Sequence, residues 1–464
     1  MRTRWISVLV LVLLATVAAA CGVRRVHVAP ATAPAALTQA SPETFDTGEY
    51  DHHWWRQFDD PVLDALQDAA LGANLDVVAA VARVDQARAL LDDVRRDRFP
   101  IVTANAAVDR REQAVPGFTD EPVRTSTFRA TLDAFWEVDL FGRVRAAMEA
   151  AGAEAQALEA SVEDVRVIVA AEVAREYFTL RGLQRQLEVA ERSLVNQRET
   201  LRLTEVRRDA GLGEEQDVAS AAARVAAIEA SVPPLRSAAM TRLHRLAVLT
   251  GVRPGALALD LQPRPYPVLA KVLSLGDVSQ LLRRRPDVRA AERRLAAAAA
   301  REGVAAAELY PRISISGALG LLAGRGSLFG RSESRMWSVT PSLQWAGFDL
   351  GSARARLRGA EAATRELLAA YEQAVLLALE ETENALVAYR EEQARLVRLA
   401  DQARESARAA QIARVRFREG FADFLSLLDA ERTQLAAEDA IAQAEAAVFV
   451  RVVQVYKSLG GIDS

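Results

Sequence analysis

Few residues of this chain have types and spacing that could carry out chemistry. The only cysteine, Cys21, rules out an intrachain disulfide, and the histidines have no neighbours at metal-ligand spacing. His52 and His53 could touch a surface metal, but adjacent histidines in a polar stretch are usually solvated. Phosphate-binding, dinucleotide-binding, zincin and nucleophile-elbow motifs do not occur. We therefore expect a protein that is not an enzyme and that uses no cofactor and no metal.

The residues that precede Cys21 have the pattern of a signal sequence. Residues 1–20 place Arg2 and Arg4 before a short apolar run that ends in alanines, which is typical of a secretory signal peptide. The end of this segment resembles a bacterial lipoprotein signal, in which the cysteine becomes the acylated (palmitate-bearing) mature N-terminus. One departure is Ala18, where that motif usually has leucine. The alternative is ordinary signal cleavage beside an incidental cysteine.

The composition favours long, closely packed helices. The 464 residues are 50% hydrophobic but only 6% aromatic, and alanine dominates the hydrophobic fraction. Alanine is the best helix former but buries little area. The net charge of -4 is too small, and the hydrophobic fraction too high, for a disordered chain. A nucleic-acid partner is not expected, because there is no basic excess.

No stretch after Cys21 looks long and apolar enough to cross a bilayer as a helix. In hydrocarbon, only helices and closed β-barrels satisfy their own backbone groups. We therefore expect the mature chain to be soluble, tethered by a lipid, or part of a β-barrel.

The two halves of the chain resemble each other at a spacing of about 210 residues. Matching pairs are Phe99-Pro100 with Tyr310-Pro311, Asp139-Leu140 with Asp349-Leu350, Glu172 with Glu381, Gly211 with Gly420, and Gly251 with Gly460. This pattern indicates a duplicated unit. The expected segments are an N-terminal extension (21–57), a first repeat (58–251), a Pro-rich connector (252–277), a second repeat (278–461) and a tail (462–464).

Each repeat contains two segments in which apolar and polar residues alternate. They span about 101–110, 126–138, 312–321 and 336–347. Period two over this length predicts β-strands, and the length suits tilted membrane strands. The tryptophans Trp136, Trp337 and Trp345 suit an interfacial girdle. The alternative is a pair of soluble, half-buried hairpins.

Helices surround these strands in the predicted order. They are expected at about 58–98, 143–210 and 215–250 in the first repeat, and at about 278–308, 352–419 and 423–459 in the second. Pro100 and Pro311 end the opening helices. At 1.5 Å per residue, each long middle helix is roughly 100 Å long. A glycine turn then reverses the chain. The returning helix is only about half as long, and the opening helix of each repeat has about the missing length. Two short helices stacked end to end could therefore lie beside each long one.

Four strands cannot close a barrel, because their edges would stay unsatisfied in lipid. Several chains must then share one barrel. Three chains give an even strand number within the range of known barrels. We therefore expect a mainly α protein with a membrane β-barrel contribution: a trimer in which a 12-stranded β-barrel continues into a 12-column α-helical barrel.

Short motifs occur in a fixed order over most of the chain. They are Trp54-Trp55, Phe58-Asp59-Asp60-Pro61, Asn74-Leu75-Asp76, Trp136 with Asp139-Leu140-Phe141-Gly142, Arg285-Pro286-Asp287-Val288, Tyr310-Pro311-Arg312-Ile313-Ser314, and Phe424 through Ala430. In this order they resemble the TolC-family outer-membrane factors, in particular the NodT/OprM-like efflux lipoproteins.

The resemblance implies a function and partners. The protein would be the outer-membrane channel of a tripartite efflux system and would passively conduct drugs, toxic compounds or metal ions. It would be a lipid-anchored homotrimer in outer-membrane lipid, with its helical barrel in the periplasm. Its partners would be a periplasmic adaptor (a membrane fusion protein) and an inner-membrane pump of the RND type.

The resemblance also implies a periplasmic gate. In the family the helical tips narrow to a closed mouth, where the pattern ends in Leu-Leu-Asp-Ala, and here that aspartate is Asp429. A ring of carboxylates in a narrow pore favours cations. Leu425, one turn earlier, could add an apolar constriction, and Asp423 is a further candidate. From the residues alone, Asp429 could instead be a solvated helix aspartate.

The two glycine turns resemble the adaptor-docking tips of the family. The first tip, about 207–218, holds Arg207, Gly211, Leu212, Asp217 and Val218, and the second, about 416–425, holds Arg416, Gly420, Phe421, Phe424 and Leu425. Leu212 and Phe421 would be exposed apolar anchors for a partner helix, unless they pack only within the tip. The first tip departs from the family at Glu214, where serine is common.

Two other functions stay open. A related duct could serve type I protein secretion. A periplasmic adaptor lipoprotein also has a helical hairpin and a lipid tail, but it should have one hairpin flanked by Gly-rich lipoyl half-motifs, whereas this sequence has two hairpins and no such halves. Cys21 and the Arg285-Pro286-Asp287 segment favour the efflux channel.

Overall fold

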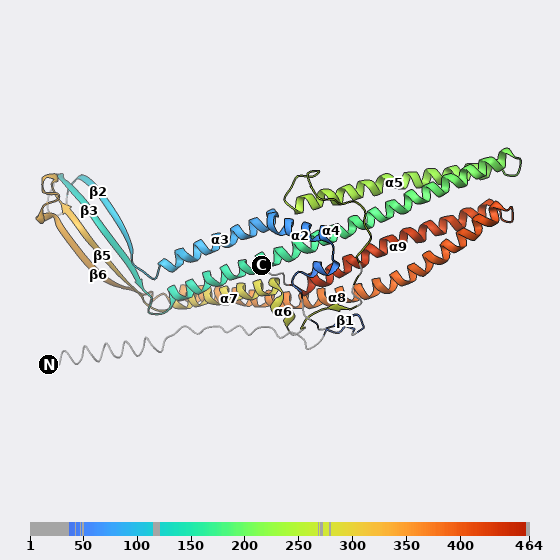
Figure 1. Cartoon of the computed structure of the whole chain (residues 1–464). Coiled ribbons are helices and arrows are strands. Elements are labelled where there is room, and N and C mark those ends of the chain that lie inside the picture. The colour runs from blue at the N-terminus through green and yellow to red at the C-terminus, as the bar shows by residue number, and fades with distance from the viewer. Residues whose placement is uncertain are drawn as a thin grey trace. The chain divides into compact units, whose positions relative to one another are not determined.

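The computed structural model describes residues 37–41, 43–46, 48, 51–114, 121–267, 269, 272–277 and 280–460. Cys21 and the expected signal peptide lie outside these residues. The described chain is mainly helical (Figure 1) and divides into two compact units, each of which takes parts of both halves of the sequence. Unit 1 contains Arg83–Glu159 and Ala290–Glu372, and unit 2 contains Ala160–Arg289, Gln373–Ser464 and the described residues up to Ala82.

Unit 1 contains an antiparallel sheet of four strands. Figure 1 shows β2 (Ile101–Gln113), β3 (Val123–Val138), β5 (Arg312–Ala323) and β6 (Arg335–Gln344) side by side in that order. The two halves of the chain meet where β3 pairs with β5, from Phe128 opposite Ala323 to Val138 opposite Ile313. β2 and β6 are therefore the edges of the sheet. Pro341, which cannot donate a ladder hydrogen bond, lies on the edge strand β6.

Unit 2 contains the two reversals between the long and the returning helices. The long helices α4 (Arg143–Asp209) and α8 (Leu350–Arg418) are followed by α5 (Glu215–Leu249) and α9 (Phe424–Leu459). Both turns place a glycine in the left-handed region, Gly211 at φ 75° and Gly420 at φ 80°. In the first turn, the amides of Gly211 and Leu212 donate to the carbonyls three and five residues earlier, both at 2.8 Å. This Schellman motif satisfies the last carbonyls of the helix, and the second turn repeats it.

The single helix expected at about 58–98 is broken. The structure has α2 (Pro61–Ala73) and α3 (Leu75–Arg96), separated by Asn74 in an extended conformation. The Asn74 side chain accepts from the amides of Asp76 at 2.9 Å and Val77 at 3.3 Å, and so caps α3. Its amide group donates to the Leu249 carbonyl at 2.9 Å. The prediction of a single helix was therefore wrong, because Asn74, a buried capping residue, separates α2 from α3.

The helix expected at about 278–308 is also broken, into α6 (Leu281–Arg284) and α7 (Pro286–Ala307). Pro286 keeps Arg285 extended, with ψ 116°, because the residue before a proline avoids the helical region. The Arg285 side chain is buried and donates to the Ser458 carbonyl at 2.7 Å. It also pairs with Glu381 at 2.8 Å. At the break, Arg285 thus links α8, which holds Glu381, to α9, which holds Ser458.

One helical stretch among the described residues qualifies as a candidate membrane span by length and composition, although none was expected. It is Pro61–Arg96, in which an 18-residue window has a mean hydropathy of 1.2 and is 33% buried. The stretch consists of α2 and α3 with the break at Asn74 between them. A lone candidate of this kind is weak evidence for a transmembrane helix.

A cluster of buried aromatic residues lies in the core of unit 2. The 3-10 helix η1 (Trp54–Phe58) supplies Trp54, Trp55 and Phe58, each at most 2% exposed. Trp54 stacks on Tyr456 at 5.5 Å between ring centroids, and Phe178 stacks on Phe449 at 4.7 Å. A short parallel pair, β1 (Phe45–Asp46) with β4 (Leu273–Ser274), adjoins this core through Phe45 and Leu273. These large side chains fill the core of unit 2, which the small alanine side chains of the surrounding helices could not fill.

Candidate functional sites

The sheet of unit 1 has one apolar face. Residues that pair directly lie on the same face of a sheet, so the register assigns the faces. Two successive rows of this face are Val102–Ala134–Gly317–Val339 and Ala104–Leu132–Leu319–Trp337. No other described residues cover the larger side chains: Trp337 is 77% exposed and Leu319 is 64% exposed. A contiguous exposed apolar face of this kind usually marks contact with another protein or with a membrane.

The height of the apolar face can be worked out from β3. Alternate residues from Phe128 to Val138 lie on this face. Ten residue steps of about 3.4 Å, tilted by about 40°, give a band about 26 Å tall. Outer-membrane barrels have an apolar band about 25 Å tall, so this face is suited to contact with hydrocarbon.

The opposite face of the sheet is mostly polar and internally hydrogen-bonded, although Ile101 and Phe135 also lie on it. Asn105 donates to the Asp133 carboxylate at 2.6 Å, and Thr131 donates to the same carboxylate at 3.2 Å. The hydroxyls of Ser314 and Ser342 lie 2.7 Å apart. These groups are suited to contact with water, so the sheet separates an apolar environment from an aqueous one.

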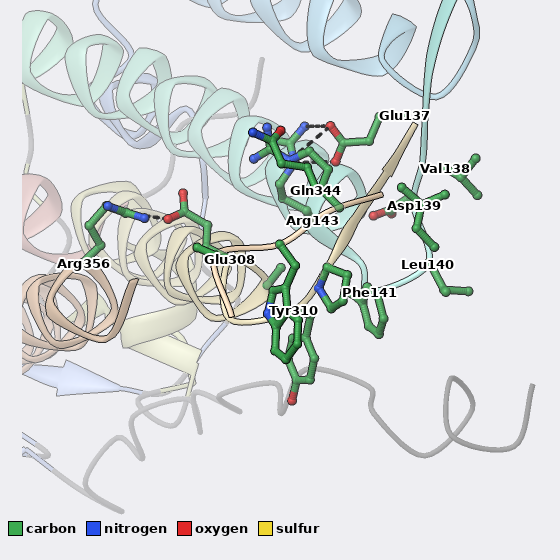
Figure 2. A pocket seen from close by; sticks show the side chains of 16 residues that line it. Glu137, Val138, Asp139, Leu140, Phe141, Arg143, Glu308, Tyr310, Gln344 and Arg356 are labelled. Atoms are coloured by element: carbon green, nitrogen blue, oxygen red, sulfur yellow. Dashed lines mark hydrogen bonds and ion pairs between the residues drawn. The ribbon is translucent and has the colours of Figure 1, made fainter. Parts of the chain in front are cut away.

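A cavity of about 340 Å³ lies in unit 1, where the strands lead into the helices. Figure 2 shows Glu137, at the end of β3, beside Arg143, at the start of α4. Glu137 accepts two hydrogen bonds from Arg143, at 2.7 and 2.8 Å, and Arg312 lies 3.8 Å away. Nearby, Phe141 stacks on Tyr310 at 5.1 Å between centroids. These contacts hold the start of α4 against the start of β5.

Two of the three candidate interface tryptophans have hydrogen-bonding partners at this junction. The Trp136 indole donates to the Arg98 carbonyl at 3.1 Å, and the Trp345 indole donates to the Leu309 carbonyl at 3.0 Å. Each of these carbonyls lies just beyond the end of a helix, α3 or α7. Trp345 follows β6, which ends at Gln344 rather than near 347. Trp337 lies near the other end of β6 and is exposed.

The structure brings the two tips of unit 2 together. Arg207 donates to the Phe417 carbonyl at 3.1 Å, and its guanidinium lies over the Phe417 ring at 4.8 Å. Each tip arginine also reaches the carbonyl of the residue after its own glycine, from Arg207 to Leu212 and from Arg416 to Phe421, both at 3.4 Å. Leu212 is 70% exposed and Phe421 is 76% exposed.

Other predicted tip residues lie inside the tips. Phe424 is 3% exposed and packs with Phe417, Ala221 and Leu427. Val218 is also buried, and Asp217 lies in the first turn of α5. Glu214 occupies the N-cap of α5 but its side chain makes no capping bond, whereas a serine there would accept one. Phe424 and Val218 can therefore shape the tips but cannot lie on their outer surface.

The candidate gate residues lie at the start of α9. Asp429 is exposed, with its carboxylate 2.6 Å from the Arg432 guanidinium. Leu425, four residues earlier and therefore on the same helix face, is 62% exposed. Asp423 caps α9 by accepting from the Ser426 amide at 2.7 Å. Hydrogen bonds from Ser426 lower the pKa of Asp423. Nowhere in the described part of the chain could a group of three or more His, Cys, Asp or Glu hold a metal ion.

Sequence reasoning missed a polar layer near the tips. Glu431 is 6% exposed, and its carboxylate accepts from Arg414 at 2.7 Å and from Thr200 at 3.4 Å. The sequence did indicate that Glu431 is buried, because it continues the three- and four-residue spacing of the buried Phe424 and Leu427. A glutamate at an apolar position of a helix needs a partner. The identity of that partner depends on which helix packs alongside.

Comparisons with known proteins give the family. The family model described as "Outer membrane efflux protein" matches residues 66–252 and 278–461. Outer membrane protein OprJ of Pseudomonas aeruginosa is 31% identical over 88% of this chain and 86% of its own length. The toluene efflux pump outer membrane protein TtgC of Pseudomonas putida is also 31% identical, over 88% of this chain and 84% of its own length. The solved outer-membrane channel OprN superposes with a TM-score of 0.92 at 50% identity, over 94% of this chain and 98% of its own. The chain therefore belongs to the outer membrane efflux protein family.

Proposed function

We propose that this outer-membrane efflux channel assembles as a homotrimer whose three sheets close a single barrel. One observation carries the proposal: the four-stranded sheet has an uncovered apolar face, a polar opposite face and two open edges. An open edge in lipid would leave backbone groups unsatisfied. If β6 of each copy pairs with β2 of the next, both edges are paired, apart from the N–H that Pro341 lacks, and the strand number is even.

The proposed trimer surrounds the pore with the helices of all three copies. The helical tube would extend into the periplasm, with the tips of unit 2 at its far end. Leu212 and Phe421, both largely exposed, would contact a periplasmic adaptor, and an inner-membrane pump of the RND type would supply the energy. Burial of two large apolar side chains is favourable on binding. The cargo would be small molecules, as the name of the toluene efflux relative suggests.

Asp429 is the proposed gate residue. Threefold symmetry would place three copies of Asp429 around the axis, with Leu425 one turn away as an apolar constriction. The Arg432 guanidinium 2.6 Å from Asp429 would partly neutralise each carboxylate, and this would weaken the preference of the ring for cations. Acylated Cys21 would be the lipid anchor.

Conductance of the purified protein in planar bilayers tests this function. The wild type should insert as a trimer with a small conductance, and Asp429→Ala should raise that conductance several-fold and reduce cation selectivity. Asp209→Ala is the matched control, because Asp209 is also an exposed aspartate paired with a neighbouring arginine, at 2.7 Å from Arg208. A wild type that is already wide open and is unchanged by Asp429→Ala would overturn the gate assignment. A monomer that conducts alone would overturn the shared barrel.

A further inference from the structure

The charged residues on the apolar face of the sheet are confined to one end of it. Arg110 lies two residues after Val108 on β2 and therefore on this face. Arg335, on β6, lies opposite Leu321 and so on the same face. Both lie toward the end where β2 leads to β3 and β5 leads to β6. At the other end, where the strands meet the helices, the last rows of this face are apolar and include Val138, Ile313 and Leu343.

These two arginines differ from the other charged pair on the same face. Arg124 is neutralised by Glu112, which lies directly opposite it in the register at 2.7 Å. Arg110 and Arg335 are exposed, and neither has an ion pair among the residues that the structure describes. Each is therefore a net positive charge at the border of an apolar band.

Arg110 and Arg335 also lie on opposite edges of the sheet, on β2 and on β6. In the proposed trimer, β6 of one copy lies beside β2 of the next. The closure would therefore place Arg335 of one copy and Arg110 of its neighbour at the same end and on the same face of one seam. Two like charges on adjacent strands are unfavourable unless an anion lies between them.

We propose that Arg335 of one copy and Arg110 of the next form a binding site for the phosphate groups of the lipid A glycolipid of the outer leaflet. This inference rests on the proposed trimer. The site lies at the end of the band away from the helices, which is the end that would face the cell exterior. The outer leaflet of an outer membrane is built from glycolipid with a phosphorylated headgroup. Guanidinium groups bind phosphate through charge-assisted, bidentate hydrogen bonds.

The chain offers a matched control on the other face of the same sheet. Arg129 pairs with Ala107 and Leu322 in the register, so it lies on the face opposite to Arg110 and Arg335. Like them, it is exposed and has no ion pair within the described part of the chain. Arg129→Gln removes an arginine charge from the same sheet, on β3, but leaves both arginines of the proposed site intact.

Binding of lipid A to the full-length trimer in detergent tests the proposal, with native mass spectrometry or a titration as readout. The probes are bis-phosphorylated lipid A, the same lipid after removal of its phosphates, and phosphatidylglycerol. A basic side chain at a charged membrane surface contributes about fivefold in affinity, so the Arg110→Gln/Arg335→Gln variant should bind lipid A about 25-fold more weakly. Arg129→Gln should bind as the wild type does, and the dephosphorylated lipid should not distinguish the variants.

Several outcomes would overturn the site. These are unchanged binding in the double variant, an equal loss in Arg129→Gln, or phosphatidylglycerol binding as tightly as lipid A. A conducting trimer with any of these results would leave the proposed channel intact and remove only the glycolipid site. A wild type that is not a trimer would overturn the shared barrel, and the seam site with it.

Discussion

Replacement of Glu137 by glutamine should show how firmly the junction between strands and helices is held. Glu137 accepts two hydrogen bonds from Arg143, and the two side chains are only 13% and 28% exposed. Loss of one partner of a fully buried pair costs about 3 to 5 kcal/mol, whereas an exposed pair contributes about 0 to 1 kcal/mol. Glu137→Gln keeps the shape and one acceptor, so we expect a loss of about 2 kcal/mol in the free energy of unfolding.

The same sheet contains the matched control. Glu112 and Arg124 also form an ion pair at 2.7 Å, but their side chains are 49% and 83% exposed. Glu112→Gln should therefore change stability by less than about 0.5 kcal/mol. Denaturant unfolding of the protein in lipid vesicles, followed by tryptophan fluorescence, measures both variants. A double-mutant cycle with Arg143→Gln should return a coupling energy of about 2 kcal/mol.

Two results would refute this reasoning. If Glu137→Gln and Glu112→Gln destabilised the protein equally, burial would not decide the strength of these pairs. If the cycle showed no coupling, Glu137 would act through Arg312 or through packing, and the ion pair with Arg143 would not hold β3 to α4.

The remaining predictions concern pH dependence and the glycine turns. Burial, with Asp287 and Glu381 nearby, raises the pKa of Asp164 from 3.8 to about 6. The folded protein then holds this proton more tightly than the unfolded chain. The contribution of Asp164 to stability is therefore most favourable below about pH 4 and is lost as the pH rises through about 6. Asp164→Asn should raise the free energy of unfolding by about 1 to 3 kcal/mol at pH 8 and leave it nearly unchanged at pH 4, as measured by urea titration; an equal effect at both values would contradict this. Gly211 and Gly251 both have φ 75°, but an added Cβ would meet nothing at Gly211 and would lie 2.5 Å from the Ala73 carbonyl oxygen at Gly251. Gly211→Ala should therefore cost about 1 kcal/mol from backbone strain alone, and Gly251→Ala should lower the thermal midpoint clearly more; equal midpoints would contradict the clash.

Local patterns predicted much of this fold correctly. The alternation of Val102, Ala104, Ala106 and Val108 marked both the strand β2 and its apolar face, because side chains alternate between the faces of a strand. Gly211 and Gly420 marked the helix reversals, because a left-handed residue ends a helix most easily as glycine. These features depend on a few neighbouring residues, so they can be read without knowledge of packing.

Pattern reasoning failed where a distant residue decided the outcome. The break at Asn74 is stabilised by the Leu249 carbonyl, which is 175 residues away. The fourth strand ends before Trp345, whose indole donates to the Leu309 carbonyl at the end of α7. Phe424 looked like a docking residue but is buried in a cluster that includes Ala221, on the distant helix α5. In each case the local sequence allowed two outcomes and a contact with a distant segment selected one.

By itself, then, the sequence determined the kind of each element and the residues that share a face, because backbone geometry imposes periods of two and 3.6 residues. The sequence also contained the family resemblance, because the order of its short motifs can be read from the sequence alone. Only the tertiary structure decided the partners: β3 beside β5, Arg414 for Glu431, and Arg285 for Glu381. Partner choice depends on chain segments that meet only after folding, and periodicity within one segment does not encode which other segment will lie beside it.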